Sequence, residues 1–413
     1  MRLPVPSCSA HRPAPVSRQD RPGGSAGIPA GRRATWRRLL GAALLLLPAA
    51  ACAPQAPSRP VAVAPGQAPL AALPVEPPRN RVGLLLPLSG GNRALGQAML
   101  NASQLALFDQ GDPGIELLPR DTGSTAAGAG EAARVALAEG AKAFAGPLTL
   151  GETAAAAGAA RASGAPVLAY TSDASQAGRG VWVMGLTPGE QAERMLEAAA
   201  AAGARRVGLL AADDEFGRRL GAGLRARATA LGLPAPLLQL HARLGDVAAA
   251  ARELAEKAQP DGLDAVLLGH GGERARQAAA ALVAALPMAP RFLGTALWAG
   301  DASLAQEPAL AGAWFPGPDP QARAGFDSRY QAAFGEKPPR LAGVAYDAAA
   351  LAARAVREPG GNPPLGQPML GADGPILLAP NGLAQRGLAI FAVDPAGEPT
   401  LVEPAPIPGS PAS

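Results

Sequence analysis

The chain has 413 residues, 48% of them hydrophobic, and a formal net charge of +4. Residues 1–51 hold eight arginines and one acid and carry +7, so residues 52–413 carry 4 − 7 = −3. This mildly acidic part lacks the basic stripe typical of nucleic-acid binding, so we expect no nucleic-acid partner. Both cysteines, Cys8 and Cys52, precede the part with a folded pattern, and the histidines are few and unclustered, which argues against a disulfide framework, a thiol nucleophile and a zinc site there.

The N-terminal part has the pattern of an export signal followed by a tether. Leu39–Ala51 is an apolar stretch of thirteen residues after basic residues, too short to span a bilayer and typical of a secretory signal. Small residues then precede Cys52, as at a bacterial lipoprotein processing site, although Ala49 stands where leucine is usual. We therefore predict a leader with a disordered N-region over residues 1–51, lipidation at Cys52 and a proline-rich tether over 52–79. The alternative is ordinary signal cleavage, with Cys52 an incidental thiol.

From residue 80 onward, short apolar runs alternate with helix-spaced segments. The run Val82–Leu86 is uncharged and is followed by Pro87, Ser89 and two glycines, which predicts a strand buried on both faces of a parallel sheet. The same unit recurs three times, and one more strand follows. We expect the further strands at 115–118, 141–145, 166–170 and 181–185, and helices at 93–109, 125–139 and up to 162.

The pattern restarts after residue 188, which predicts a second lobe of the same design. We expect its strands at 206–211, 237–240, 263–268, 292–293 and 313–315, with helices between them. A crossover at 316–320 then leads to helices at 321–334 and 341–356, and a second crossover covers 360–368. We predict a hairpin of 376–378 and 388–393 around Asn381-Gly382, and a frayed tail over 394–413. The domain prediction is 80–188 plus 319–365 for one lobe, 189–318 plus 366–404 for the other, and a disordered tail at 405–413.

Several segments resemble the type I periplasmic-binding fold and, more narrowly, the penicillin-binding-protein activator lipoproteins. They are Val82–Gly90, Asp121-Thr122, Gly146–Leu148, Gly185–Pro188, Gly294–Trp298, Phe326–Tyr330, Tyr346–Ala348, Gly371–Pro375, Asn381-Gly382 and Arg386-Gly387. The resemblance spans about residues 80–400. It implies an α/β protein with two doubly wound, Rossmann-like lobes, a hinge and an interlobe cleft. Amino-acid-binding proteins of ABC importers share much of this layout.

The resemblance also implies a role. Activators of this family are outer-membrane lipoproteins that stimulate a bifunctional peptidoglycan synthase, so we expect a non-enzymatic periplasmic protein, lipid-anchored to the inner leaflet of the outer membrane, whose partner is such a synthase. The best-known members also carry an N-terminal helical-repeat domain, where this chain has only the predicted tether. The alternative is a solute receptor of a branched-chain amino acid importer, with an ABC permease as partner. We expect no cofactor and no metal.

The predicted ligand-contacting residues follow strands, because ligands bind at the carboxyl ends of the strands in open α/β sheets. They are Ser89, Asp121, Thr149, Thr171, Ser172, Asp173, Phe216, His270 and Trp298. In amino-acid receptors of this fold, hydroxyls after the third and fourth strands hold the ligand carboxylate, and Thr149, Thr171 and Ser172 occupy matching places. A small amino-acid-like molecule or a peptidoglycan fragment is the ligand class this implies.

Each of these residues also has a structural alternative. Thr149, Thr171 and Ser172 suit helix N-caps, and Asp121 suits a cap better than a ligand contact. Phe216 and Trp298 fit core packing, and His270 fits a solvated glycine-rich loop. An amine would need an acid from the second lobe; Asp301 is a candidate, but Leu297-Trp298 stands at the receptor-like acidic position, which argues against a free amino acid. The chain has no Walker loop, no Gly-x-Ser-x-Gly elbow and no histidine placed for a triad, so an enzyme is not expected.

Overall fold

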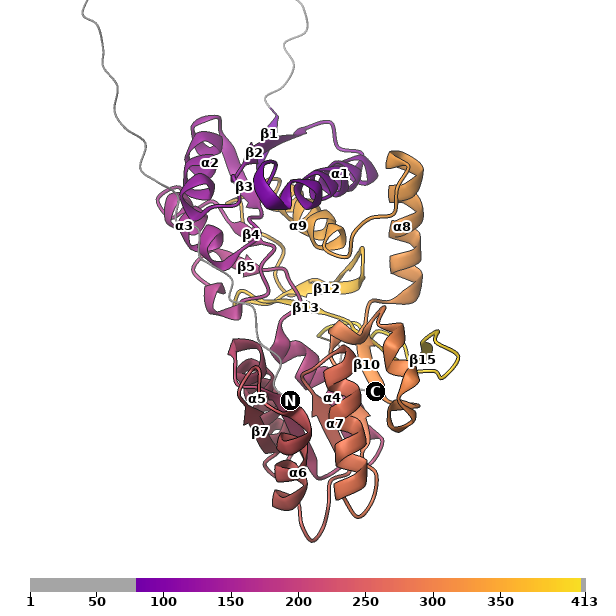
Figure 1. The fold of residues 1–413 in the computed structure, drawn as a ribbon. Helices are drawn as coiled ribbons and strands as arrows, with labels where there is room; N and C mark the ends of the chain where they lie inside the picture. The colour runs from indigo at the N-terminus through magenta and orange to yellow at the C-terminus, as the bar shows by residue number, and fades with distance from the viewer. Residues whose placement is uncertain (1–78, 410–413) are drawn as a thin grey trace, which may run out of the picture. The chain divides into compact units, whose positions relative to one another are not determined.

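The first lobe is built on a five-stranded parallel sheet in the order β2-β1-β3-β4-β5. The computed structural model of the protein describes residues 79–409, so the leader, the lipidation at Cys52 and almost all of the tether lie outside the described residues. The strands are β1 Asn80–Leu86, β2 Ile115–Asp121, β3 Ala141–Ala145, β4 Val167–Ala169 and β5 Val181–Val183. Figure 1 shows helices on both faces of this sheet, as the doubly wound prediction requires.

The helices of the first lobe come from two separate stretches of the chain, one before and one after the helices of the second lobe. They are α1 Arg93–Gln110, α2 Ala126–Ala138, α3 Leu150–Ala160, α8 Pro320–Phe334 and α9 Ala342–Ala355. The side chains of α2 and α3 form one hydrophobic cluster with the sheet, and those of α1, α8 and α9 form another. The chain therefore returns to the first lobe after building the second.

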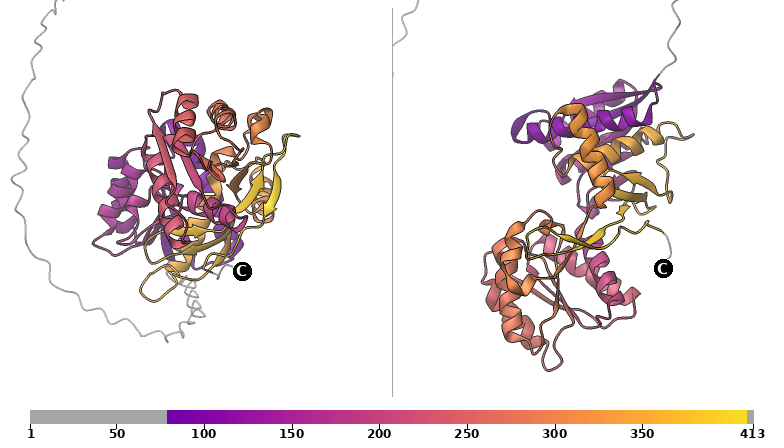
Figure 2. Two further views of the ribbon diagram at one scale, coloured as in Figure 1. Left: turned by 90° about the horizontal axis from the view of Figure 1, so that it is seen from below. Right: turned by 90° about the vertical axis from the view of Figure 1, so that its right-hand side faces the viewer.

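The second lobe is built on a seven-stranded sheet in the order β15-β14-β10-β9-β8-β6-β7. Its strands are β6 Val207–Ala212, β7 Leu237–His241, β8 Ala265–Leu268, β9 Arg291–Leu293, β10 Trp314–Gly317, β14 Ala389–Ala392 and β15 Thr400–Glu403. Its helices are α4 Pro188–Ala201, α5 Glu215–Ala230, α6 Val247–Lys257 and α7 Gly272–Ala285. The helices α4 and α5 cover one face and α6 and α7 the other (Figure 2).

A small antiparallel sheet completes the first lobe. It consists of β11 Met369–Gly371, β12 Gly374–Leu378 and β13 Ala384–Arg386, in that order. Ile376, Leu378 and Ala384 lie in the hydrophobic cluster of α1 and α9. Short 3₁₀ helices lie at Gly90–Asn92 (η1), Ala174–Gln176 (η2), Ala296–Trp298 (η3), Ala302–Gln306 (η4) and Pro308–Leu310 (η5).

Three predictions about the C-terminal part are corrected by these strands. The turn at Asn381-Gly382 joins β12 to β13, whereas the segment predicted as the second half of the hairpin forms β14, which pairs antiparallel with β10. Residues 369–386 pack with the first lobe and not the second, because their apolar side chains are buried there. The predicted frayed tail contains β15, which pairs with β14 along its free edge. Main-chain pairing of this kind leaves little trace in a proline-rich sequence.

Helix caps explain several element boundaries. Thr149 and Glu152 form a capping box at the start of α3, and Thr187 and Glu190 form one at the start of α4. Pro188 occupies the first turn of α4, where a missing N–H costs nothing. Within residues 79–409, no helix is long and apolar enough to cross a membrane.

Candidate functional site

The loops that follow β1 to β4 carry most of the predicted ligand contacts. Because these strands are parallel and adjacent, their carboxyl ends meet along one edge of the first sheet. Ser89 follows β1, Asp121 ends β2, Thr149 follows β3, and Thr171 follows β4. The structure thus brings the first-lobe candidates to one edge, as the alternation of strands and helices predicts.

Asp121 joins the loops after β1 and β2. Its Oδ1 accepts hydrogen bonds from the backbone N–H groups of Leu88 (2.9 Å), Ser89 (3.2 Å) and Gly123 (2.8 Å). Burial alone would raise the pKa of the Asp121 carboxyl, but bonds from the Ser89 hydroxyl and these N–H groups lower it below its usual value. The carboxylate therefore organises the loops, as in the structural alternative, and is bonded to the neighbouring candidate Ser89.

Thr149 is the N-cap of α3. Its hydroxyl oxygen accepts from the N–H of Glu152 at 3.4 Å, and its own N–H donates to Oε2 of Glu152 at 2.9 Å. Glu152 is buried and accepts at 2.6 Å from the Thr122 hydroxyl. The Thr149 oxygen therefore serves the cap, and only its exposed hydroxyl proton is left to donate to an anion.

The loop after β4 is anchored to the second lobe. The hydroxyl oxygen of Thr171, which is buried, accepts from the N–H of Asp173 at 3.1 Å. The Asp173 carboxylate accepts from the N–H of Ser175 at 2.9 Å and forms a 2.6 Å ion pair with Arg219 of α5. Burial alone would raise the pKa of the Asp173 carboxyl, but its bonds to Ser175 and Arg219 lower it. Ser172 is exposed in the same loop.

Arg219 was missed by the sequence analysis. It lies on α5 and also pairs with Glu215 one turn earlier, at 2.6 Å. The Glu215–Arg219 spacing is a visible signal of a surface ion pair. Nothing local connects Arg219 to Asp173, because that contact depends on how the second lobe meets the loop after β4.

The second-lobe candidates Phe216 and Trp298 are packing residues. Phe216 lies in the first turn of α5 and packs against the hydrophobic cluster of α4 and α5. Trp298 is 1% exposed, and its Nε1 donates to the His270 carbonyl oxygen at 2.6 Å. Its ring lies within the core of the second lobe, as in the structural alternative, and its contact with a ligand stays a prediction.

His270 does not lie in a solvated loop. It is 6% exposed, and its Nε2 lies 2.9 Å from Nε2 of His241, the last residue of β7. Burial, followed by the neighbouring His241 and Arg274, lowers the pKa of His270 to about 4. The two histidines that seemed unclustered in the sequence are thus in direct contact. Among residues 79–409, no group of three or more His, Cys, Asp and Glu side chains gathers for a metal ion.

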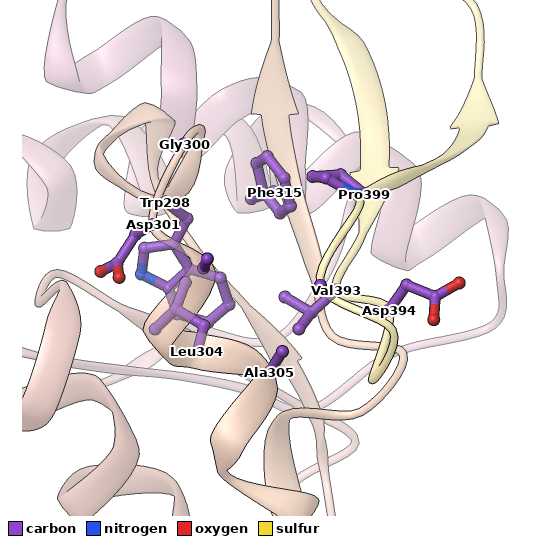
Figure 3. A pocket seen from close by; sticks show the side chains of 11 residues that line it. Trp298, Gly300, Asp301, Leu304, Ala305, Phe315, Val393, Asp394 and Pro399 are labelled. Carbon is purple, nitrogen blue, oxygen red and sulfur yellow. The ribbon is translucent and has the colours of Figure 1, made fainter.

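Two cavities are present near these elements, and both are small. One of about 90 Å³ lies in the second lobe, with Trp298 and Phe315 on its walls and Asp301 and Asp394 at its sides (Figure 3). The other, of about 110 Å³, lies where the chain crosses between the lobes and is lined by Leu186, Ala296, Gly317, Pro318, Arg323, Arg340, Leu341, Val344, Asp373, Arg386 and Leu388. Both are smaller than the enclosed cavity of about 150 Å³ that takes a benzene-sized molecule, and both are open to solvent.

Comparison with known proteins shows which family has this fold. A family model described as periplasmic binding protein matches residues 80–367, which is more than half of the chain. The chain belongs to the periplasmic binding protein family. A search of the curated proteins gave no match. Membership confirms the resemblance inferred from the strand and loop segments, and with it the two-lobed α/β fold.

Solved structures of this family resemble the chain at low identity. A putative branched-chain amino acid ABC transporter from Rhodospirillum rubrum is 19% identical, with a TM-score of 0.65 over 78% of this chain and 100% of that one. The C-domain of LpoA from Haemophilus influenzae, described as a regulator of PBP1A, is 19% identical, with a TM-score of 0.62 over the same shares. Full-length LpoA is also 19% identical, with a TM-score of 0.64 over 79% of this chain, which spans only 59% of it. At such identities the likeness establishes the fold alone.

Proposed function

We propose that the protein is a non-catalytic lipoprotein of the cell envelope that activates a peptidoglycan synthase by protein–protein contact. The observation that carries this proposal is the state of the predicted ligand loops. The Thr149 oxygen is used in a helix cap, Asp173 is paired with Arg219, and Trp298 is buried. The similarity in fold to LpoA supports the activator proposal as well, since the C-domain of that protein is described as a regulator of PBP1A.

The contacts between the lobes also suit a scaffold. The Asp173–Arg219 pair links the loop after β4 to α5, and the guanidinium of Arg340 donates to the carbonyl oxygens of Ala296 (3.1 Å) and Ala299 (3.2 Å). A binding surface that spans both lobes is presented in one arrangement when such contacts hold it. Binding would favour the active conformation of the synthase only if the protein has a higher affinity for that conformation.

The anchor and location belong to the same proposal. Diacylation of Cys52 would hold the protein stably at a membrane, because two acyl chains give lasting attachment where one does not. Ala53 rather than aspartate after the cysteine favours the outer membrane, by what is known of such lipoproteins. The proline-rich tether at 52–79 would let the folded part reach a synthase from the inner leaflet.

The second candidate function is a solute receptor for an ABC importer. It is favoured by two exposed residues at this edge: Thr149, which begins α3, where N–H groups and the helix dipole stabilise an anion, and Ser172, in the loop after the neighbouring β4. The resemblance to the Rhodospirillum rubrum protein supports it as well. The second-lobe acid nearest this edge in the contacts described above, Glu215, is paired with Arg219 at 2.6 Å, which weighs against an amino acid with a free amine.

The experiment that tests the activator proposal measures glycan polymerisation and peptide cross-linking by a bifunctional synthase from the same cell. Saturating amounts of the protein should raise these rates, and the double variant Thr149→Ala/Ser172→Ala should raise them equally, because the hydroxyls are not needed for the contact. If the protein raises these rates for none of the bifunctional synthases of the cell, the proposal is contradicted.

A thermal melt against amino acids and peptidoglycan fragments tests the receptor alternative. A solute present at 100 times its dissociation constant adds about 2.7 kcal/mol of stability, which a melt detects. We expect no shift with leucine or valine. A shift with either that disappears in Thr149→Ala/Ser172→Ala would establish the receptor instead.

A further inference from the structure

A shallow cavity in the second lobe is formed by two segments that are far apart in the sequence. Residues 298–305 of η3 and η4 form one side, and residues 393–399, between β14 and β15, form the other (Figure 3). The cavity has a volume of about 90 Å³ and is open to solvent. Its size suits one aliphatic side chain, since an enclosed cavity of about 150 Å³ takes a whole benzene molecule.

Trp298, Leu304 and Phe315 give the cavity apolar walls, and the apolar surface continues to the edge of the sheet. Phe315 on β10 lies beside Phe391 on β14, with ring centroids 5.8 Å apart, and Phe391 lies beside Leu401 on β15. This apolar strip is 2% exposed at Phe315 and 50% exposed at Leu401. Because β15 is the last strand of its sheet, no strand of the described chain lies beyond Leu401 to cover it.

The two segments that border the cavity carry only negative charge. Residues 298–307 and 393–403 contain five acids and no lysine, arginine or histidine. One of these acids, Glu403, pairs with Arg194 at 2.8 Å. The other four form no ion pair with any residue that the structure describes, and they are Asp301, Glu307, Asp394 and Glu398.

The backbone holds the two carboxylates that line the cavity in fixed positions. Oδ2 of Asp301 accepts from the N–H of Gly272 at 2.8 Å, and its Oδ1 accepts from the N–H and the hydroxyl of Ser303. Oδ1 of Asp394 accepts from the N–H of Ala396 at 2.8 Å. Figure 3 shows both carboxylates at the sides of the cavity, directed away from its centre. A cation that meets them therefore lies beside the cavity and not inside it.

Two arginines contact the first segment from neighbouring elements. Arg276 of α7 donates to the side-chain oxygen of Gln306 at 2.8 Å, and its charge is paired with Glu273. Arg340 donates to the carbonyl oxygen of Ala299 at 3.2 Å. Neither arginine forms an ion pair with the four acids, so the apolar cavity keeps a negative border.

We propose that this cavity and the apolar strip are the docking site for a basic segment of the synthase. The segment inserts one aliphatic side chain into the cavity, and lysine or arginine residues on either side of it meet Asp301 and Asp394. Opposite charges on the two surfaces speed the encounter and fix the register of the bound segment. The assignment rests on the proposed function, which supplies the partner.

A second copy of the chain fits this surface less well than a basic partner does. A two-fold dimer joins the same patch on both subunits, so it would bring the unpaired carboxylates of the two copies together. Like charges placed against each other oppose association. Lysine or arginine residues on the partner remove this repulsion, and the size of the cavity sets the size of the side chain between them.

The first test reverses the charge on one side of the cavity. Asp394→Lys/Glu398→Lys should weaken binding of the full chain to a bifunctional synthase from the same cell by at least about tenfold, mainly through slower association. The matched control Glu256→Lys/Glu336→Lys changes the net charge equally at exposed acids elsewhere, and should change the affinity by less than about twofold. Surface plasmon resonance measures both rates, and circular dichroism checks the fold.

The second test removes the exposed end of the apolar strip. Leu401→Ser should weaken binding by at least about threefold, because its side chain is half-exposed in the free chain and covered in the complex. Val402→Ser is the matched control and should leave the affinity unchanged. Val402 is 44% exposed, has no partner in the register of β14 and β15, and lies outside the strip.

The outcomes separate the docking site from the proposed function. If the unsubstituted chain binds and stimulates a synthase, and the Asp394/Glu398 and Leu401 variants do so equally well, the docking site is wrong and the activator proposal stands. Equal weakening by the Glu256/Glu336 control would also overturn the site, because only net charge would then matter. If no bifunctional synthase of the cell binds the unsubstituted chain, the activator proposal fails and the synthase is not the occupant.

Discussion

The substitution Arg386→Met should lower the free energy of unfolding by about 3–5 kcal/mol, because it leaves a buried carboxylate without its cation. Nη1 of Arg386 lies 2.6 Å from Oδ2 of Asp347, and the two side chains are 5% and 0% exposed. Such a pair adds little net stability over apolar residues, but removing one partner alone is costly. Urea unfolding measures the loss as a lower midpoint with an unchanged slope.

Two controls isolate the effect of the unpaired charge. The double variant Arg386→Met/Asp347→Asn removes both charges and should recover at least half of the lost stability. Arg329→Met breaks the more exposed pair with Asp109 and should cost less than about 1 kcal/mol. A cost for Arg386→Met that is no larger than for Arg329→Met would contradict the prediction.

The position of Arg386 explains why this pair matters to the fold. It ends β13, immediately before the chain crosses to β14 in the second lobe, and its Nη2 donates to the carbonyl oxygen of Met184 at 3.0 Å. Met184 immediately precedes the first crossing, between β5 and α4. Asp347 in turn accepts from the N–H of Ala372 at 2.7 Å. One buried pair thus joins two of the crossings to α9 and the small sheet.

The sequence predicts the parts of the fold that depend on local pattern. Buried apolar runs such as Val82–Leu86 identify the parallel strands, and Thr149 identifies a helix start, because both signals lie within a few residues. The resemblance to a known family predicted that the strands and helices form two lobes. The predicted pairing of residues 376–378, in β12, with 388–393, in β14, was wrong because adjacent short apolar segments do not reveal which sheet each will join.

The candidate site was predicted less completely, for a related physical reason. The carboxyl ends of β1 to β4 follow from strand order, so Ser89, Asp121 and Thr149 were correctly placed at one edge. Contacts such as Asp173–Arg219 join residues from different lobes, and no periodicity encodes them. The burial of Trp298 likewise depends on the packing of η3 against β10, which composition does not specify.

The second large effect is a dependence of stability on pH that His270 should produce. Its pKa is about 4 in the folded chain, against an ordinary value of 6.5. Below pH 6.5 the unfolded chain binds a proton that the folded chain does not, so the free energy of unfolding falls as the pH is lowered from 6.5 to 4. The stabilisation from this group is fully present above pH 6.5 and is lost by about pH 4.

A depression of this size corresponds to about 3 kcal/mol, with a slope of up to about 1.4 kcal/mol per pH unit. Urea unfolding at pH 7.5, 6.0, 5.0 and 4.0 measures it. The lowered pKa values of Asp121 and Asp173 place the loss of their contribution in more acidic solution. Burial raises the pKa values of Glu190 and Asp347, so only the difference between the unsubstituted chain and His270→Gln at each pH isolates the histidine. His270→Gln should flatten the curve from pH 6.5 to 5 while lowering the whole of it, since the hydrogen bond to His241 is altered. An unchanged slope in His270→Gln would show that the buried histidine is not the titrating group, and that its ring reaches water more readily than its 6% exposure implies.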